Sequence, residues 1–108
     1  MLTNNLEMLK RGSREGFAIP AINTQGGQYD IIRACTKAAQ EMRSPIILAH
    51  YVSTGAYSGH DWFVETAKWC ANKVDVPVSI HLDHGDGFPI CMEALRLGFT
   101  SVMIDGST

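Results

Sequence analysis

Two histidines and two aspartates lie close together in the stretch IHLDHGDGF, residues 80–88, at the end of an apolar run. Imidazole groups bind metal ions or move protons near neutral pH, and carboxylates serve as acids, bases or metal ligands. A regular strand would place His81 and Asp83 on one face and His84 on the other. Asp83 and His84 can therefore share a site only if the backbone leaves strand geometry there, and we expect the two glycines that follow to permit this.

Polar side chains also end the other apolar runs of the chain. Asn23 follows FAIPAI, His50 and Tyr51 follow SPIILA, and Asp105 follows TSVMI. In a barrel of parallel strands the carboxyl ends of the strands meet at one mouth, where active sites are built. These positions therefore predict a single polar site at the ends of the strands.

Helical and strand-like segments alternate along the chain and must position these residues. The patterns predict helices over residues 4–16, 29–43 and 61–74 and within 85–99, and strands over 17–24, 44–52, 76–84 and 100–107. Asp61 is expected to cap the third helix. Pro89 fits the first turn of the fourth helix and Gly98 the position just past its end. The stretch STGAYSG is expected to be a loop.

This alternation predicts an α/β fold with a parallel sheet and helical crossovers. Two architectures fit it, an open doubly wound sheet or part of a (β/α)8 barrel. An open sheet of this size should carry a glycine-rich phosphate loop after its first strand, and NTQGGQ matches neither of the common patterns. The polar ends of all the strands favour the barrel.

The chain has 108 residues, a hydrophobic content of 45% and a formal net charge of -2, which are ordinary values for one globular domain. Its lysines and arginines are scattered, which argues against a nucleic-acid partner. No apolar run approaches the roughly 18 residues of a membrane span. The cysteines, Cys35, Cys70 and Cys91, show no paired spacing and fit reduced thiols in a core. We therefore expect a cytoplasmic protein.

The motif HLDHG followed by GFTSVMIDGS resembles the class II fructose-bisphosphate and tagatose-bisphosphate aldolases, and the similarity extends over essentially the whole chain. The resemblance implies a metal-dependent TIM barrel, usually with zinc, that cleaves a ketose bisphosphate into glycerone phosphate and an aldehyde phosphate. By the same resemblance Asp83 is the acid/base and His84 a zinc ligand. Asn23 faces the substrate, and Asp105 lies near the metal and a second cation. A sugar phosphate and further copies of the chain are the implied partners.

The sequence departs from the family in the loop after the second strand. A serine or threonine usually stands where Tyr51 aligns, and Ser53 is a neighbouring hydroxyl that could replace it in substrate binding. A different ketose phosphate is therefore a further interpretation. His50 and His60 are more simply structural histidines, and His81 either supports the site or is hydrogen-bonded in the core.

A full barrel takes about 250 residues, and the chain holds only about four of its strands. We therefore expect residues 1–108 to be an incomplete domain, the N-terminal half of a (β/α)8 barrel, with little or no aldolase activity when isolated. In the resembled family the other zinc histidines lie beyond the last residue present. The alternative is a non-catalytic barrel remnant that binds a sugar phosphate, or a partner chain through its open sheet.

Overall fold

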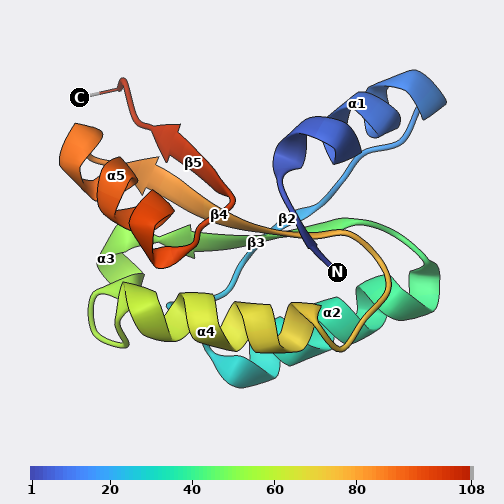
Figure 1. The fold of residues 1–108 in the computed structure, drawn as a ribbon, viewed down its shortest axis with the longest axis horizontal. Coiled ribbons are helices and arrows are strands. Elements are labelled where there is room, and N and C mark those ends of the chain that lie inside the picture. The colour runs from blue at the N-terminus through green and yellow to red at the C-terminus, as the bar shows by residue number, and fades with distance from the viewer. Residues whose placement is uncertain (108) are drawn as a thin grey trace.

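The computed structural model describes residues 1–107, which fold into a five-stranded parallel sheet with covering helices (Figure 1). The strands are β1 (Leu2–Thr3), β2 (Ala21–Asn23), β3 (Ile46–Tyr51), β4 (Val78–Gly85) and β5 (Ser101–Ile104). The helices are α1 (Asn5–Glu15), α2 (Tyr29–Met42), α3 (Val52–Gly55), α4 (His60–Ala71) and α5 (Phe88–Leu97). The predicted α/β alternation and parallel pairing are confirmed.

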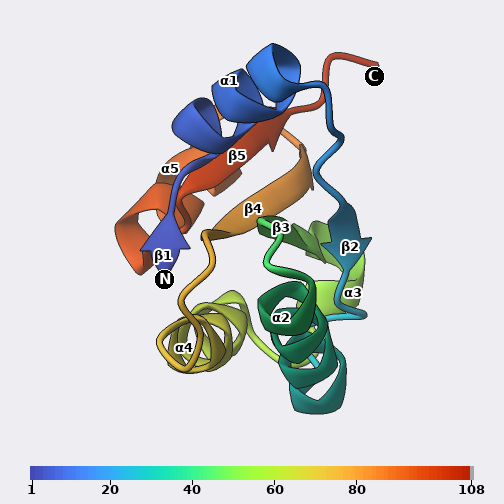
Figure 2. The ribbon, with the colours of Figure 1, turned by 90° about the vertical axis from the view of Figure 1, so that its right-hand side faces the viewer.

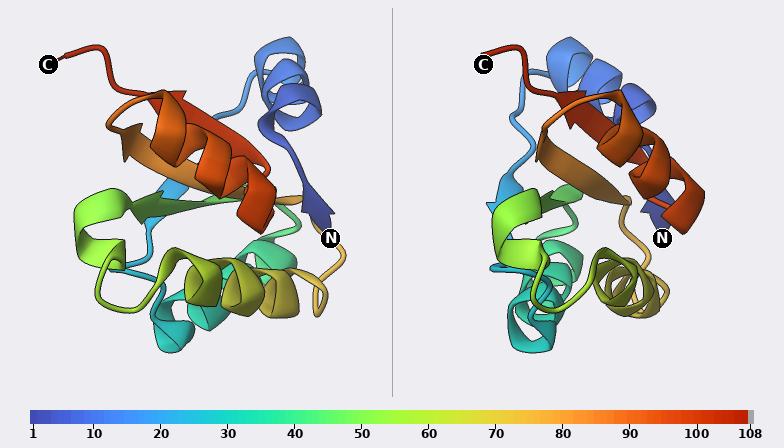
Figure 3. Two further views of the ribbon diagram at one scale, coloured as in Figure 1. Left: turned by 60° about the vertical axis from the view of Figure 1, so that its left-hand side comes forward. Right: turned by 90° about the vertical axis from the view of Figure 1, so that its left-hand side faces the viewer.

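Strands β2, β3, β4 and β5 lie side by side in the order of the chain. The short strand β1 pairs with the start of β4, on the edge that β5 occupies farther along. Helices α2 and α4 run next to each other along one face of the sheet, whereas α1 lies on the opposite side (Figures 1, 2 and 3). Repeated parallel strand-helix units of this kind build (β/α)8 barrels.

The two faces of β4 have opposite chemistry. Val78, Ile80 and Leu82 are fully buried on the outer face, in one apolar cluster with residues of α4. Burying each such side chain stabilises the fold by about 1.5–3 kcal/mol. Ser79, His81 and Asp83 alternate with them and define the inner face. The outer face of β4 therefore packs against α4, and its inner face carries polar groups.

Helix ends follow the expected chemistry in α5 and depart from it in α4. Pro89 lies in the first turn of α5, and Gly98 ends that helix in the left-handed conformation with φ 112. In α4, however, the N-cap is Gly59 and the helix begins at His60. The expectation that Asp61 caps this helix was wrong, because its Oδ1 accepts from the backbone N–H of the next residue instead.

Three segments differ from their sequence-based assignment, the first being Leu2–Thr3, which forms the unpredicted strand β1. The apolar stretch 17–24 forms a strand only over Ala21–Asn23, which lies at an edge of the sheet with all three residues exposed. The stretch expected to be a loop after the second strand instead starts with the short helix α3, Val52–Gly55. Within residues 1–107 no helix combines the length and apolarity needed to cross a bilayer.

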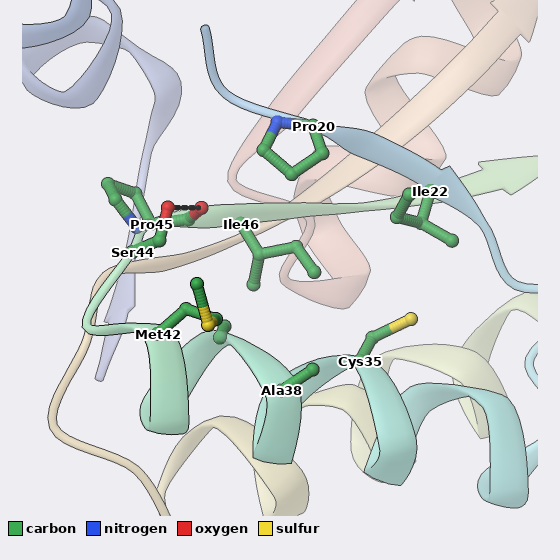
Figure 4. Close-up of a pocket in the computed structure, with 9 residues that line it drawn as sticks. Pro20, Ile22, Cys35, Ala38, Met42, Ser44, Pro45 and Ile46 are labelled. Carbon is green, nitrogen blue, oxygen red and sulfur yellow. Dashed lines mark hydrogen bonds between the residues drawn. The ribbon is translucent and has the colours of Figure 1, made fainter. Parts of the chain in front are cut away.

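A large hollow of about 570 Å³ follows the free edge of β2. In Figure 4, Pro20 and Ile22 lie above it and Ala38 and Met42 of α2 line it from below. Its walls are almost entirely apolar. This hollow lies between the edge of β2 and helix α2. None of the polar residues at the strand ends lines it, so it is separate from the predicted polar site.

Candidate active site

Asp83, His84 and Asp105 come together where β4 and β5 end. Nδ1 of His84 lies 2.8 Å from Oδ2 of Asp105, and Nε2 of the same ring lies 3.8 Å from Oδ2 of Asp83. The His84 side chain is 50% exposed, compared with 33% for Asp83 and 18% for Asp105. The site therefore has a solvent-accessible imidazole nitrogen, Nε2 of His84, next to the solvent-accessible carboxylate of Asp83.

The backbone of His84 makes this meeting possible. His84 adopts the left-handed conformation with φ 52, and the pairing of β4 with β5 shifts register between Leu82 and Gly85. The departure from strand geometry that the sequence required is therefore present. The glycines are not where it occurs, because Gly85 continues the strand and His84 itself takes the rare conformation. A non-glycine residue held with positive φ is strained and often marks a functional site.

Gly85 has a different role. A Cβ at this position would lie 2.7 Å from the carbonyl oxygen of Met103 and 2.8 Å from Sγ of Cys91. The lack of a side chain lets β5 and α5 approach β4 closely, and the backbone N–H of Asp105 then donates to the Gly85 carbonyl at 2.9 Å. This backbone hydrogen bond places the Asp105 side chain within hydrogen-bonding distance of His84.

The electrostatics of the three groups are coupled. Hydrogen bonds from Ser107 and His84 lower the pKa of Asp105 to about 2. The hydrogen bond to Asp105, assisted by the charge of Asp83, raises the pKa of His84 above its ordinary value of 6.5. Asp105 therefore stays ionised and fixes the orientation of the ring, leaving Nε2 free for a ligand.

Tyr51, which the sequence placed at a strand end and where it departs from the resembled family, is a neighbour of this group. It lies opposite Asp83 in the register of β3 and β4, and its ring meets the His84 ring edge-on with 5.7 Å between centroids. Its adjacent residue in the chain, His50, points the other way. His50 is fully buried on the outer face and stacks on Phe63. The expectation that both residues reach the mouth therefore holds only for Tyr51.

Asn23 and Ser53 lie on the periphery of the group. Asn23 ends β2 in register with Ala49, which in turn pairs with His81, so that Asn23 shares the inner face. Its Oδ1 accepts from the backbone of Gln25 at 2.8 Å, which leaves the amide N–H groups available. Ser53 is exposed on α3, and within residues 1–107 it makes no hydrogen bond to Asp83, His84 or Asp105.

The residues fit one part of a metal site. His84 offers Nε2 with its other nitrogen held by a carboxylate, which is the usual arrangement of a metal-binding histidine. Over the described part of the chain, no group of three or more His, Cys, Asp or Glu side chains is arranged to hold an ion. A catalytic zinc is normally held by three protein ligands. Further ligands would therefore have to come from outside residues 1–107.

Comparison with known proteins gives consistent matches. A family described as fructose-bisphosphate aldolase class-II matches residues 3–108. A fructose-bisphosphate aldolase from Thermus caldophilus is 40% identical over 107 residues, which cover 99% of this chain and 34% of that protein. The GatY subunit of a D-tagatose-1,6-bisphosphate aldolase from Klebsiella oxytoca is 34% identical, over 98% of this chain and 37% of the subunit. The chain thus spans about a third of the length of these curated relatives.

Solved structures agree with this result. The YdjI aldolase from Escherichia coli K12 superposes with a TM-score of 0.88 at 26% identity, over 99% of this chain and 40% of that one. A putative fructose-1,6-bisphosphate aldolase from Coccidioides immitis gives a TM-score of 0.81 at 31% identity, over 93% and 39%. The fold described above is accordingly a partial (β/α)8 barrel, as the sequence predicted.

Proposed function

The chain belongs to the class II fructose-bisphosphate aldolase family, and we propose that it forms the amino-terminal part of a barrel that cleaves a ketose 1,6-bisphosphate. The products are glycerone phosphate and an aldehyde phosphate. The observation that supports this is the Asp83-His84-Asp105 group, which combines an exposed carboxylate with an oriented imidazole at the strand ends. A cytoplasmic, homo-oligomeric enzyme with a sugar-phosphate substrate is part of the same proposal.

Asp83 is the proposed acid/base. Its carboxylate takes the proton of a substrate hydroxyl while the adjacent carbon–carbon bond breaks. The hydroxyl carbon becomes the aldehyde carbonyl, and the electron pair of the broken bond passes to the ketone fragment. The carbon that receives this pair then takes up a proton to give glycerone phosphate. In the reverse direction Asp83 returns the proton to the newly formed hydroxyl. Its partial exposure at the end of β4 leaves it open to a substrate.

His84 is the proposed zinc ligand, through Nε2, and Asp105 holds the ring by its other nitrogen. When bound, the cation supplies Lewis-acid stabilisation of the negative charge that develops on the ketone fragment. Asp105 is also the residue proposed to lie next to a second cation. Asn23 and Ser53 are the proposed substrate-binding residues, Asn23 through the amide N–H groups on the inner face and Ser53 through its hydroxyl on α3.

A chimeric barrel tests the proposal. Residues 1–108 would replace the matching segment of the Thermus caldophilus aldolase, which is 40% identical there. We expect the chimera to cleave a ketose 1,6-bisphosphate in the presence of zinc, and Asp83→Asn to lower kcat about 100-fold or more, the usual contribution of a general acid/base. Asp86→Asn, in the loop directly after β4, is the matched control and should retain activity. A D83N chimera as fast as its parent would contradict the assignment.

The isolated chain is expected to show little or no cleavage activity, because the described residues provide only one metal-binding imidazole at the strand ends. A second candidate function, a non-catalytic remnant that associates through its sheet, is favoured by the free edge of β2 and its apolar hollow. Metal content separates the two candidates. Zinc bound by the chimera and lost in His84→Ala supports the aldolase, whereas a folded chimera that binds no zinc supports the remnant.

A further inference from the structure

A series of hydrogen bonds links helix α1 to the inner face of the sheet. Asn5, in the first turn of α1, uses both ends of its amide: Oδ1 accepts from the Ser79 hydroxyl of β4, and Nδ2 donates to Oγ of Ser101 of β5 at 2.9 Å. Oγ of Ser101 lies 2.7 Å from Nδ1 of His81. Three elements of the fold therefore converge on one histidine, which lies outside the Asp83-His84-Asp105 group.

The donors and acceptors along this series determine where the hydrogen of the His81 ring lies. The Ser101 oxygen accepts from Asn5, and its single hydroxyl hydrogen has no other partner than Nδ1 of His81 within residues 1–107. If Nδ1 accepts that hydrogen, a neutral ring must carry its own hydrogen on Nε2. The Ser101 hydroxyl hydrogen then has an acceptor, which a partly buried polar group requires, and within residues 1–107 the Nε2–H of His81 is the donor that makes no hydrogen bond.

His81 lies close to Asp83 on the inner face of β4. His81 pairs with Ser101 across the β4–β5 boundary, and Asp83 lies two residues farther along the same face, at a Cα separation of roughly 7 Å. Burial lowers the pKa of His81, and this effect exceeds the opposing one from the charge of Asp83. The ring is therefore neutral near pH 7, and its Nε2–H belongs to the inner face next to the proposed acid/base.

We propose that Asn5 and Ser101 are positioning residues that hold His81 as the neutral Nε2–H tautomer, so that it presents a hydrogen-bond donor beside Asp83. A neutral N–H group can bind a hydroxyl or phosphate oxygen of a ligand. Unlike a protonated ring, it adds no positive charge near the Asp83 carboxylate beyond that of the proposed cation. That use of the donor rests on the proposed aldolase function, whereas the tautomer does not. Helix α1, which packs on the far side of the sheet from α2 and α4, thereby acts on the site through His81 (Figure 2).

Nitrogen-15 NMR of the 108-residue chain tests the proposal, because the two ring nitrogens of His81 give distinct shifts when one is protonated and the other accepts. We expect Nε2–H in the native chain. Asn5→Asp removes the amide donor, so that the carboxylate accepts from the Ser101 hydroxyl and the Ser101 oxygen accepts from the ring. We expect this variant to move the hydrogen to Nδ1. An aspartate in the first turn of a helix is favourable, so the variant should fold.

Ser79→Ala is the matched control. It removes the other contact of Asn5 and leaves the path from Asn5 through Ser101 to His81 intact, so the Nε2–H tautomer should persist. Nδ1–H in the native chain would overturn the proposal, since it would mean that the amide of Asn5 is turned round. An unchanged Nε2–H tautomer in a folded N5D chain would overturn it as well. Should N5D fail to fold, the native spectrum alone decides. Failure of the chimera to cleave substrate would contradict the aldolase function and leave this result unaffected.

Discussion

Nδ1 of His84 is hydrogen-bonded to Oδ2 of Asp105 at 2.8 Å, and the two residues are 21 positions apart in the chain. The contact joins the ends of β4 and β5 and exists because His84 adopts a left-handed backbone conformation. One carboxylate thereby holds the ring, while a second, Asp83, stands beside the free nitrogen. The properties of His84 should depend on Asp105 more than on any other residue of the chain.

Asp105→Asn should lower the pKa of His84 toward its ordinary value of 6.5, because the hydrogen bond to Asp105 is the main cause of its elevation. Because the pKa of His84 is raised and that of Asp105 is lowered from 3.8 to about 2, the pair stabilises the fold fully between about pH 4 and 6.5; the contribution is lost as the pH rises through the elevated value of His84 and as it falls toward 2. NMR titration of the His84 ring measures the change. Asp86→Asn is the control and should leave the titration where it was. An unaltered His84 pKa in D105N would show that the contact is absent in solution.

The pair His50 and His60 should make the fold sensitive to acid. Nε2 of His50 lies 2.8 Å from Nδ1 of His60, and burial, together with the charge that His60 can carry, lowers the pKa of His50 to about 4. The unfolded chain takes up this proton near 6.5 and the folded chain does not, so stability is complete above pH 6.5 and falls as the pH drops toward 4. We expect a loss on the order of 1–3 kcal/mol from this group between pH 7 and 4.

His50→Gln provides the comparison, because glutamine does not titrate in this range. Urea unfolding of both proteins at a series of pH values gives the free energies. The difference in stability between the two should shrink as the pH falls below 6.5. Equal acid sensitivity in the native chain and in H50Q would exclude His50 as its source.

Gly55→Ala should be strongly destabilising. Gly55, at the end of α3, packs against the His50 ring so closely that a Cβ would overlap the imidazole, and the ring is itself stacked on Phe63 with 4.3 Å between centroids. Overpacking of this kind usually costs about 1–3 kcal/mol. Gly106→Ala is the control, since a Cβ there meets nothing within 4 Å and should change stability by no more than about 0.5 kcal/mol. Thermal unfolding of both variants gives the comparison, and similar melting temperatures would contradict the packing argument.

The sequence predicted those features that depend on local pattern. The stripe of apolar residues over 29–43 and the Pro89 and Gly98 signals identified α2 and α5 almost to the residue, since period and cap chemistry are local properties. The sequence pattern and the family resemblance together predicted that Asp83 and His84 share one site. By contrast, α3 has only four residues and no period to detect. The stretch 17–24 forms a strand only over Ala21–Asn23, which begins directly after Pro20 and lies at an edge of the sheet, so the proline was a local signal of this outcome.

The contacts that matter most in the site are long-range, and this is why the sequence alone missed them. Asn5 and Ser79 are separated by 74 positions, and nothing in a first-turn asparagine indicates that it reaches a strand residue so distant. His50 and Tyr51 are adjacent, yet strand alternation sends one into the core and the other to the site. Strand alternation alone does not say whether His50 or Tyr51 faces the core. That depends on which face of β3 the helices cover, which only the structure shows.

The free edge of β2 should promote association between copies of the chain. Unpaired strand edges and contiguous apolar hollows are templates for pairing, and the hollow beside β2 is lined by Met42, whose side chain is 76% exposed. We expect concentration-dependent association in analytical ultracentrifugation, and Met42→Lys should weaken it at least several-fold by placing a charge in the hollow. Leu95→Lys is the matched control, because Leu95 is an exposed apolar residue on α5, away from this edge. A chain that stays monomeric at high concentration, or one that M42K and L95K affect equally, would mean that the edge of β2 is not the contact.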